Sequence, residues 1–357
     1  MSVSGAGDSS PAPGPATFGD RLTQAVAARE SQIVLGIDPD PSRLWPGPVG
    51  QSSEPRAELA QALAAAHESA VAVAGAGGLA MPAPETNGGE TARAGAPQLQ
   101  PPAIEAAAAV LAHCLALIDA AAPACVAAKP QLACFERLGF AGALALEAVC
   151  ARARAAGLLV IADGKRGDVP VTAAAYEQAL TGATQTPFGP VPGLAVDAFT
   201  ANPLLGRDAL APLIDGARKA QAGVFVLVRT SNPGAADLMD LPLESGEPLW
   251  ERLAALAHEL GRGDGLHDVG AVTGATAPQH LERMRELMPR TPFLLPGVGA
   301  QGGDVAALKP AFAPGRAAGL VTASRSIAHA HEATKGDPAA AARAEAERLR
   351  ELAWTLA

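Results

Sequence analysis

The sequence predicts one (β/α)8 barrel, and three features of the chain indicate it. Short apolar segments recur with the length of buried strands, Ala- and Leu-rich helical stretches separate them, and polar residues follow several of them. The eight predicted strands are Ile33–Ile37, Cys125–Lys129, Leu158–Ala162, Leu194–Ala198, Val224–Val228, Val269–Thr273, Phe293–Pro296 and Leu320–Ala323. An open doubly wound sheet is the alternative, but no G-x-G-x-x-G motif follows the first strand, which disfavours dinucleotide binding.

The rest of the chain fits one domain with additions. Its 357 residues leave room beyond a barrel of about 250 residues. Residues 1–17 are Ser, Gly, Ala and Pro with no basic start, which predicts a disordered tail rather than a secretory signal, and 18–357 are the expected barrel domain. Residues 75–102 are dense in Gly, Pro and Ala and predict a disordered insertion before a helix over Ile104–Ala121. Residues 184–192 predict a shorter insertion before the fourth strand.

Composition excludes several classes of partner. The net charge of -9 disfavours binding to nucleic acids or anionic membranes, which require a basic surface. No apolar run approaches the roughly 20 residues of a membrane helix, so no membrane span is expected. The four cysteines lack C-x-x-C spacing and lie mostly in Ala-rich surroundings, which predicts small buried side chains in a reduced cytoplasm.

Polar residues follow most of the predicted strands, at the end where barrel enzymes carry their active sites. They are Asp38 after the first strand, Lys129 at the end of the second, Asp163 and Lys165 after the third, Ser231 after the fifth and Arg325 after the eighth. A Gly-rich loop from Pro296 to Gly303 follows the seventh strand. Only five lysines occur in the chain, and two of them fall at these strand ends. The sequence therefore predicts a charged site at one mouth of the barrel.

The segment from Asp163 to Asp168 places two carboxylates and an ammonium at one strand end. If the backbone stays extended, Asp163 and Lys165 project to the same side and Gly164 to the other, so an ion pair is aimed at one place. Lysine can release its proton at a tuned pKa whereas arginine effectively cannot, so Lys165 is a candidate general acid. A structural ion-pair network at the rim is the alternative, and the charges on neighbouring strands favour an active site.

The loops after the last two strands predict a phosphate site. Gly297–Gly303 can present backbone N–H groups, and Arg325 can donate two parallel hydrogen bonds to a phosphate. A tight turn is the alternative explanation of the glycines, but phosphate sites of barrels commonly occupy this position. His329 and His331 lack acidic neighbours at ligand spacing, so no metal site is predicted.

Two further polar residues have simpler interpretations. His113 lies in a predicted helix that is buried or half-buried, and it is expected to be structural. No G-x-S-x-G or other nucleophile motif surrounds Ser231, which is therefore predicted to form a hydrogen bond with a substrate rather than to attack it.

Together these residues resemble the orotidine 5'-phosphate decarboxylase family, and in particular its longer bacterial subfamily called type 2. The resemblance covers most of the chain. The matching segments are Phe18–Arg21, Leu35–Asp40, Lys129–Gln131 with Phe135 and Glu136, the D-x-K-x-x-D segment Asp163–Asp168, Ala201–Pro203, Thr230–Ala235 and Pro296–Gly303. The combination is highly specific, although D-x-K-x-x-D alone is shared with sugar-phosphate decarboxylases.

The resemblance implies a (β/α)8 barrel that converts orotidine 5'-monophosphate to UMP and CO2, the final step of de novo pyrimidine nucleotide synthesis, without metal or organic cofactor. The implied roles are a catalytic array of Lys129, Asp163, Lys165 and Asp168, ribose binding by Asp38, pyrimidine binding by Ser231, substrate contact by Pro296, phosphate binding by Gln301 and Arg325, and a phosphate loop containing Gly299, Gly302 and Gly303. It also implies a homodimer in which Asp168 and Thr172 lie at a shared site. Gly164 departs from the subfamily, which usually has alanine there.

The chemistry explains why such an array is needed. Loss of CO2 from C6 leaves an anion in the plane of the pyrimidine ring, where π delocalisation helps little, so an ammonium at C6 is the direct means of stabilisation. Lys165 is expected to supply it and then the proton, while Asp163 and Lys129 orient it. Asp168 is expected to repel the substrate carboxylate, by about 4 kcal/mol for charges about 4 Å apart at an effective dielectric of about 20.

Two other functions fit part of the pattern. A Mg2+-dependent sugar-phosphate decarboxylase shares D-x-K-x-x-D and stabilises an enediolate. A non-catalytic barrel that binds a phosphorylated ligand would use the same charged rim only for recognition.

Overall fold

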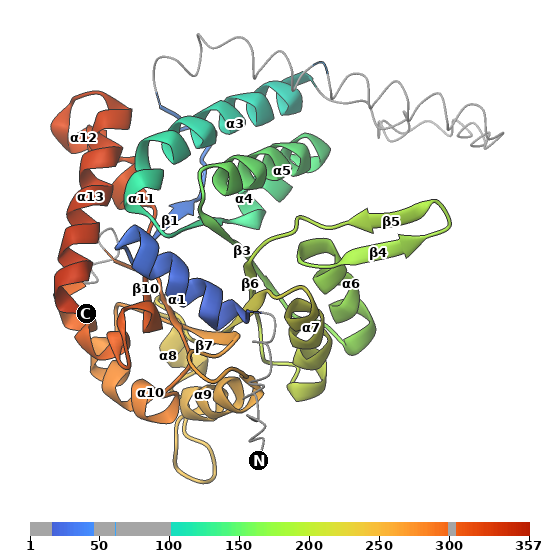
Figure 1. Cartoon of the computed structure of the whole chain (residues 1–357), viewed down its shortest axis with the longest axis vertical. Coiled ribbons are helices and arrows are strands. Elements are labelled where there is room, and N and C mark those ends of the chain that lie inside the picture. The colour runs from blue at the N-terminus through green and yellow to red at the C-terminus, as the bar shows by residue number, and fades with distance from the viewer. Residues whose placement is uncertain (1–15, 46–60, 62–100, 299–304) are drawn as a thin grey trace, which may run out of the picture.

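The computed structural model describes residues 16–45, 61, 101–298 and 305–357, and it confirms the (β/α)8 barrel. Eight parallel strands close in the order β1-β10-β9-β8-β7-β6-β3-β2 (Figure 1). Their bounds are β1 Ile33–Ile37, β2 Ala127–Pro130, β3 Leu159–Arg166, β6 Ala198–Ala201, β7 Gly223–Arg229, β8 Val269–Thr273, β9 Phe293–Leu295 and β10 Gly319–Ala323. Because all strands run in one direction, their carboxyl ends meet at one mouth of the barrel.

One predicted strand is wrong in position. The fourth barrel strand begins at Ala198, where the predicted segment Leu194–Ala198 ends. The backbone N–H groups of Leu194 and Val196 donate to carbonyls at the end of helix α6 rather than to the sheet. This apolar segment therefore closes the turn from α6 into the barrel.

Helices form the outer layer of the barrel (Figure 1). The α-helices are α1 Phe18–Arg29, α3 Pro101–Ala121, α4 Leu132–Glu136, α5 Gly139–Ala155, α6 Pro170–Leu180, α7 Arg207–Lys219, α8 Ala235–Leu238, α9 Leu249–Leu260, α10 Leu281–Leu287, α11 Arg325–Ala328, α12 Ala330–Thr334 and α13 Pro338–Leu356. Short 3-10 helices are η2 Ala122–Ala124, η3 Pro278–His280, η4 Val305–Phe312 and η5 Arg316–Ala318. The larger apolar cluster fills the space between these helices and the strands.

Helix α1 closes the barrel at the amino ends of the strands and lies across that mouth in Figure 1. It begins with a capping box in which the Thr17 hydroxyl accepts from the Asp20 N–H and the Asp20 carboxylate accepts from the Thr17 N–H. Phe18 then packs edge-to-face on Phe225, with 5.9 Å between ring centroids. A Cβ at Gly223 would lie 2.3 Å from the Phe18 ring, so only glycine leaves room for this contact.

Helix α3 corrects the expectation that no apolar run is long enough to span a membrane. Residues Pro102–Ala124 meet that test by length and composition. The helix packs against α5 and α13, and more than half of this stretch is buried inside the protein. Its apolar character is accounted for by this packing, since a helix that is apolar nearly all round belongs in a protein interior.

The two predicted insertions differ in what the structure describes. Residues 184–192 lie within an antiparallel hairpin of β4 Ala183–Thr186 and β5 Gly189–Pro192, which projects from the barrel beyond α6 (Figure 1). Phe188 at its turn is 99% exposed. Most of the predicted 75–102 insertion lies outside the described residues, but its last two residues already belong to α3, which begins at Pro101. Residues 1–15 of the predicted tail also lie outside them.

Candidate active site

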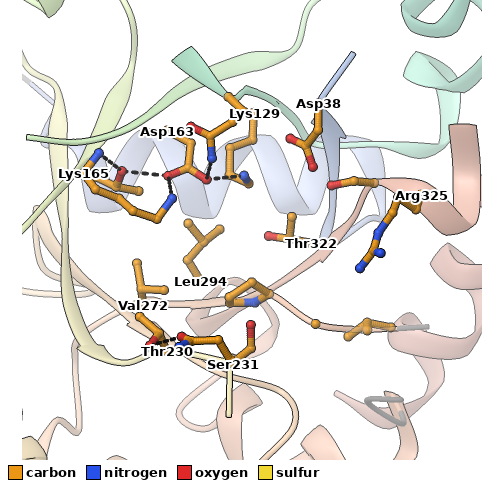
Figure 2. Close-up of a pocket in the computed structure, with 17 residues that line it drawn as sticks. Asp38, Lys129, Asp163, Lys165, Thr230, Ser231, Val272, Leu294, Thr322 and Arg325 are labelled. Atoms are coloured by element: carbon orange, nitrogen blue, oxygen red, sulfur yellow. Dashed lines mark hydrogen bonds and ion pairs between the residues drawn. The ribbon is translucent and has the colours of Figure 1, made fainter. Parts of the chain in front are cut away.

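A cavity of about 370 Å³ opens at the carboxyl ends of the strands. It is lined by Asp38, Lys129, Gln131, Asp163, Lys165, Thr200, Thr230, Ser231, Asn232, Val272, Leu294, Pro296, Gly297, Val298, Thr322, Ser324 and Arg325. The barrel thus brings together charged residues from four strand ends (Figure 2). Apolar side chains such as Val272 and Leu294 form its floor, because inward-facing residues of the strands fill the barrel below.

The Asp163 carboxylate is the centre of the charged cluster (Figure 2). Its Oδ1 accepts from Lys165 Nζ at 2.6 Å and from Thr200 Oγ1 at 2.9 Å. Its Oδ2 accepts from Lys129 Nζ at 2.5 Å and from Gln131 Nε2 at 3.3 Å. Donors from three strands and the residue after β2 therefore fix both oxygens of one carboxylate.

Burial and charge act in opposite directions on this cluster. Burial alone would raise the pKa of Asp163, but the Lys129 and Lys165 ammonium groups outweigh it and hold that pKa well below its usual range. Burial would likewise lower the pKa of Lys129, but the carboxylates of Asp163 and Asp38 outweigh it and raise that pKa. Both groups of the buried pair are therefore charged at neutral pH.

Lys165 reaches Asp163 by a backbone path that the sequence did not predict. Its φ is +47°, in the left-handed region, and a β-bulge interrupts the pairing of β3 with β6 between Ala162 and Arg166. The predicted pairing of Asp163 with Lys165 is present, but the extended backbone expected for it is wrong. Bulges beside active sites re-aim side chains, and here the bulge leaves the Lys165 side chain 44% exposed.

Arg325 and the Lys165 ammonium lie at opposite ends of the cavity (Figure 2). Among the residues that the structure describes, the Arg325 guanidinium has no carboxylate partner, so its hydrogen-bond donors are available to an anion. Asp38 follows β1, which lies between the strand of Lys129 and the strand of Arg325. The cavity therefore offers an ammonium, a carboxylate and a guanidinium along its length.

The loop that carries Ser231 is held by an ion pair outside the cavity. Arg229 donates two hydrogen bonds of 2.8 Å to the carboxylate of Asp240, so this cation at a strand end is not available to a ligand. Thr276 Oγ1 donates to the Ser231 carbonyl at 2.9 Å. These contacts fix the Ser231 backbone and leave its side chain at the wall of the cavity (Figure 2).

Comparison with known proteins decides the family. The model of the orotidine 5'-phosphate decarboxylase / HUMPS family matches residues 105–344, which is more than half of the chain. The chain belongs to this family. The matched range includes the whole Lys129, Asp163 and Lys165 cluster and Arg325.

Relatives with curated names agree with this assignment to the decarboxylase family. The chain is 38% identical over 323 residues to orotidine 5'-phosphate decarboxylase of Haloarcula marismortui, covering 90% of each chain. It is 44% identical over 242 residues to the enzyme of that name from Deinococcus radiodurans, covering 66% of this chain and 82% of the relative. The solved structure of Leishmania donovani OMP decarboxylase has a TM-score of 0.62 and 26% identity, covering 94% of this chain and 99% of the other.

Two residues that the family resemblance implied for the site lie outside the cavity of the single chain. Asp168 accepts a hydrogen bond of 2.7 Å from the Val169 N–H, and Thr172 lies in the first turn of α6. Neither residue lines the cavity. The predicted phosphate residues Gly299, Gln301, Gly302 and Gly303 lie outside the described residues, which resume at Val305.

Gly164 lies against the side chain of Leu132. A Cβ added at Gly164 would lie 2.7 Å from Leu132 Cδ1 and 3.2 Å from Arg166 Nε. Both atoms belong to flexible side chains, so the alanine usual in the subfamily requires only that Leu132 move aside. The glycine is therefore a local packing difference that leaves the charged residues unchanged.

Sequence reasoning missed two threonines of the cavity, Thr200 and Thr322. Thr200 contacts the charged cluster directly, and Thr322 is buried in the wall with a hydroxyl that has no hydrogen-bond partner in the described part of the chain. Thr200 also lies in the strand that was predicted four residues too early. A single hydroxyl within an apolar strand gives no local signal, although correct placement of this strand would have put Thr200 beside Lys165.

Three histidines, His113, His329 and His331, pack near Trp45, and none of them lines the cavity. Rings of His113 and His331 lie edge-on to Trp45, with centroid distances of 5.3 and 6.3 Å. Across residues 16–45, 101–298 and 305–357, no group of three or more His, Cys, Asp or Glu side chains is arranged to hold a metal ion. His113 is 4% exposed, as expected for a structural residue.

A larger cavity of about 710 Å³ opens at the other mouth of the barrel. It is lined mainly by apolar residues of α1, of the loops before β8, β9 and β10, and by Trp354 of α13. None of the predicted site residues reaches it. Position at the carboxyl ends of the strands, together with charge, therefore identifies the smaller cavity as the candidate active site.

Proposed function

We propose that this chain decarboxylates orotidine 5'-monophosphate to UMP and CO2. The observation that carries the proposal is the Lys165 ammonium, held 2.6 Å from the Asp163 carboxylate inside a cavity whose far end carries Arg325. Membership of the decarboxylase family and the names of its curated relatives support the same activity. This decarboxylation is the final step of de novo pyrimidine nucleotide synthesis.

The chemistry requires a fixed cation at one carbon. The bond between C6 and the carboxylate breaks, CO2 leaves, and the electron pair stays on C6 in the ring plane. Lys165 stabilises this pair and then transfers a proton from Nζ to C6, which gives UMP. Asp163 and Lys129 hold Lys165 in place, so little reorganisation is needed when the charge develops. Solvent returns the proton to Lys165, whose side chain is 44% exposed.

Other residues bind the parts of the substrate that do not react. Arg325 binds the phosphate, together with Gln301 and the loop of Gly299, Gly302 and Gly303. Asp38 accepts hydrogen bonds from ribose hydroxyls, and Ser231 and Pro296 contact the pyrimidine. Binding energy gained at a remote phosphate can position the ring against the lysine and exclude water, which raises the rate of the chemical step.

We also propose a homodimer with shared active sites. Asp168 and Thr172 lie outside the cavity of their own chain and are flanked by Val169 and Val171, which are 55% and 85% exposed. Leu204, after the neighbouring strand β6, is 54% exposed. Apolar side chains exposed around two polar residues are typical of a subunit interface. In the dimer, Asp168 reaches the partner's cavity and repels the substrate carboxylate.

The reaction proposed here uses no metal or organic cofactor and takes place in the cytoplasm. The side chains of the cavity themselves supply the cation, the proton and the orienting carboxylate that the chemistry needs. The four cysteines are free thiols, and three of them are buried, which suits a reducing compartment.

A spectrophotometric decarboxylation assay with EDTA tests the function. We expect full activity on orotidine 5'-monophosphate with the chelator present, and a loss of at least about 1,000-fold in Lys165→Ala. Lys219→Ala is the matched control, because this lysine is exposed at the end of α7. Activity that disappears with EDTA favours the sugar-phosphate decarboxylase, and binding without turnover favours the non-catalytic barrel. Full activity of Lys165→Ala contradicts the proposed proton donor.

A further inference from the structure

The bulge that carries Lys165 has one residue opposite it. The pairing of β3 with β6 joins Ala162 to Phe199 and resumes at Arg166 with Ala201. Between these pairs β3 contributes three residues, whereas β6 contributes only Thr200. The regular hydrogen bonds of a parallel ladder are therefore interrupted where the lysine is placed.

The Thr200 hydroxyl replaces part of the interrupted ladder. Thr200 Oγ1 accepts a hydrogen bond of 2.9 Å from the Lys165 backbone N–H. The same hydroxyl donates a hydrogen bond of 2.9 Å to Asp163 Oδ1, the oxygen that also accepts from Lys165 Nζ. One buried hydroxyl thus joins the backbone of the lysine to the carboxylate that holds its ammonium.

We propose that Thr200 is a positioning residue for the decarboxylation, acting through the Lys165 backbone and the Asp163 carboxylate. The inference rests on the proposed function, in which Lys165 stabilises and protonates C6. A non-glycine residue with positive φ is held there only when its surroundings fix it. The hydrogen bond from its N–H to Thr200 Oγ1 is a contact that fixes it in this way.

Removal of the hydroxyl has two consequences for the charged cluster. Thr200 is 1% exposed, so in Thr200→Val water cannot readily replace the lost hydroxyl. The Lys165 N–H then lacks this acceptor, and Asp163 Oδ1 keeps the lysine but loses its second donor. The left-handed segment can relax, and the ammonium moves away from the position at which C6 develops charge.

The test compares Thr200→Val with Thr200→Ser. We expect Thr200→Val to lower kcat by about 100-fold with little change in KM, because a displacement of about 1 Å at a reacting group has an effect of this size. Thr200→Ser retains the hydroxyl and is expected to recover most of kcat. Thr273→Val is the matched control, since Thr273 is a fully buried threonine at the end of β8 whose hydroxyl has no partner in the described part of the chain.

Crystal structures of the wild type and Thr200→Val provide the second readout. We expect Lys165 to keep its left-handed backbone in the wild type and to lose it, or its contact with Asp163, in Thr200→Val. An unchanged kcat in Thr200→Val, equal losses in the serine and valine variants, or an unchanged Lys165 geometry overturns the positioning role. If the wild type does not decarboxylate the substrate but the bulge relaxes only in Thr200→Val, the proposed function fails while the positioning of Lys165 by Thr200 stands.

Discussion

Lys129 Nζ lies 2.5 Å from Asp163 Oδ2, and both side chains are less than one-tenth exposed. The two residues come from adjacent strands β2 and β3, so their contact depends on the register of the barrel. A buried charge pair of this kind is weak evidence for stability by itself, because both ions lose their hydration. The pair is better explained as a fixed support for the exposed Lys165 ammonium.

Removal of Lys129 is expected to destabilise the fold. Lys129→Met preserves much of the volume but leaves Asp163 with one cation fewer, and loss of one partner from a buried pair costs about 3 kcal/mol. The free energy of unfolding measures this loss. Arg348→Met is the control, since the Arg348 side chain is 59% exposed and its pair with Glu345 on α13 is expected to contribute less than about 1 kcal/mol.

The pH dependence of the Lys129→Met effect adds a check. The pKa of Asp163 is lower in the folded protein than in the unfolded chain, where it is near 3.8. The charged carboxylate therefore contributes fully to stability at a pH above 3.8, and this contribution is lost as the pH falls through the pKa of the folded state. The difference in the free energy of unfolding between wild type and Lys129→Met should therefore become smaller in strong acid. A difference that stays constant or widens there contradicts the ion-pair explanation.

Arg325→Ala is expected to weaken the binding of phosphorylated ligands selectively. The guanidinium is free of carboxylates in the described part of the chain, so its loss removes two charge-assisted hydrogen bonds to phosphate. We expect binding of UMP to fall by about 100-fold and binding of uridine to change little, since each such bond contributes about 1.5 kcal/mol or more. Calorimetric titration of both ligands measures the two effects. Equal losses for the nucleotide and the nucleoside contradict the phosphate assignment.

Mixing two inactive variants tests the shared active sites. Lys165→Ala and Asp168→Ala are each expected to lose most activity as homodimers. A hybrid dimer has one site with both defects and one site with neither, so a random mixture should recover about a quarter of the wild-type activity. Co-refolding followed by the decarboxylation assay measures the recovery. Absence of recovery, with hybrid dimers shown to form, means that each site is built within one chain.

Stability is expected to fall in mild acid because of His113. Burial, together with the nearby His329 and His331, lowers the pKa of His113 to about 4. In the unfolded chain the pKa of His113 is near 6.5, so above this pH the ring is neutral in both states and the fold keeps its full stability. As the pH falls from 6.5 toward 4, the unfolded chain binds a proton that the folded protein does not, and stability is lost. The loss is about 3 kcal/mol. Denaturant unfolding at several pH values measures it.

His113→Asn is the variant that isolates this effect. The Asn side chain can still accept the hydrogen bond of 3.2 Å that the backbone N–H of Trp45 donates to His113 Nδ1, but Asn does not titrate. We expect the free energy of unfolding of His113→Asn to depend less on pH between 6.5 and 4 than that of the wild type. A comparison of the two proteins at pH 8 gives the loss of stability that the substitution itself causes. Parallel curves for the two proteins contradict the role of His113.

Most of the fold could be predicted because barrel strands are short, apolar and bounded by turns. The predicted segments Ile33–Ile37 and Val269–Thr273 agree with the bounds of β1 and β8. The segment Leu194–Ala198 contains Asp197 and an exposed Ala195, and the N–H groups of Leu194 and Val196 donate to the end of α6 before β6 begins. A short run that is mostly apolar therefore does not by itself distinguish a strand of the sheet from a turn that leads into it.

The candidate site was predictable where charge makes a residue conspicuous. Lys129, Asp163, Lys165 and Arg325 were all expected at strand ends, and all of them line the cavity. Thr200 was not predicted, because a neutral hydroxyl in an apolar strand looks the same whether it binds a lysine backbone or nothing. Its partners are 35 and 37 residues away in the sequence.

The sequence by itself determined the barrel, the charged groups at its mouth and the strand that carries each of them. It could do so because apolar periodicity and the positions of lysines and aspartates are local properties. Only the tertiary structure decided that Lys165 takes a left-handed backbone in a bulge, and that Asp163 receives four donors from three strands and the residue after β2. Hydrogen bonds and ion pairs depend on distances of a few ångströms, and strand register sets these distances between residues far apart in the chain.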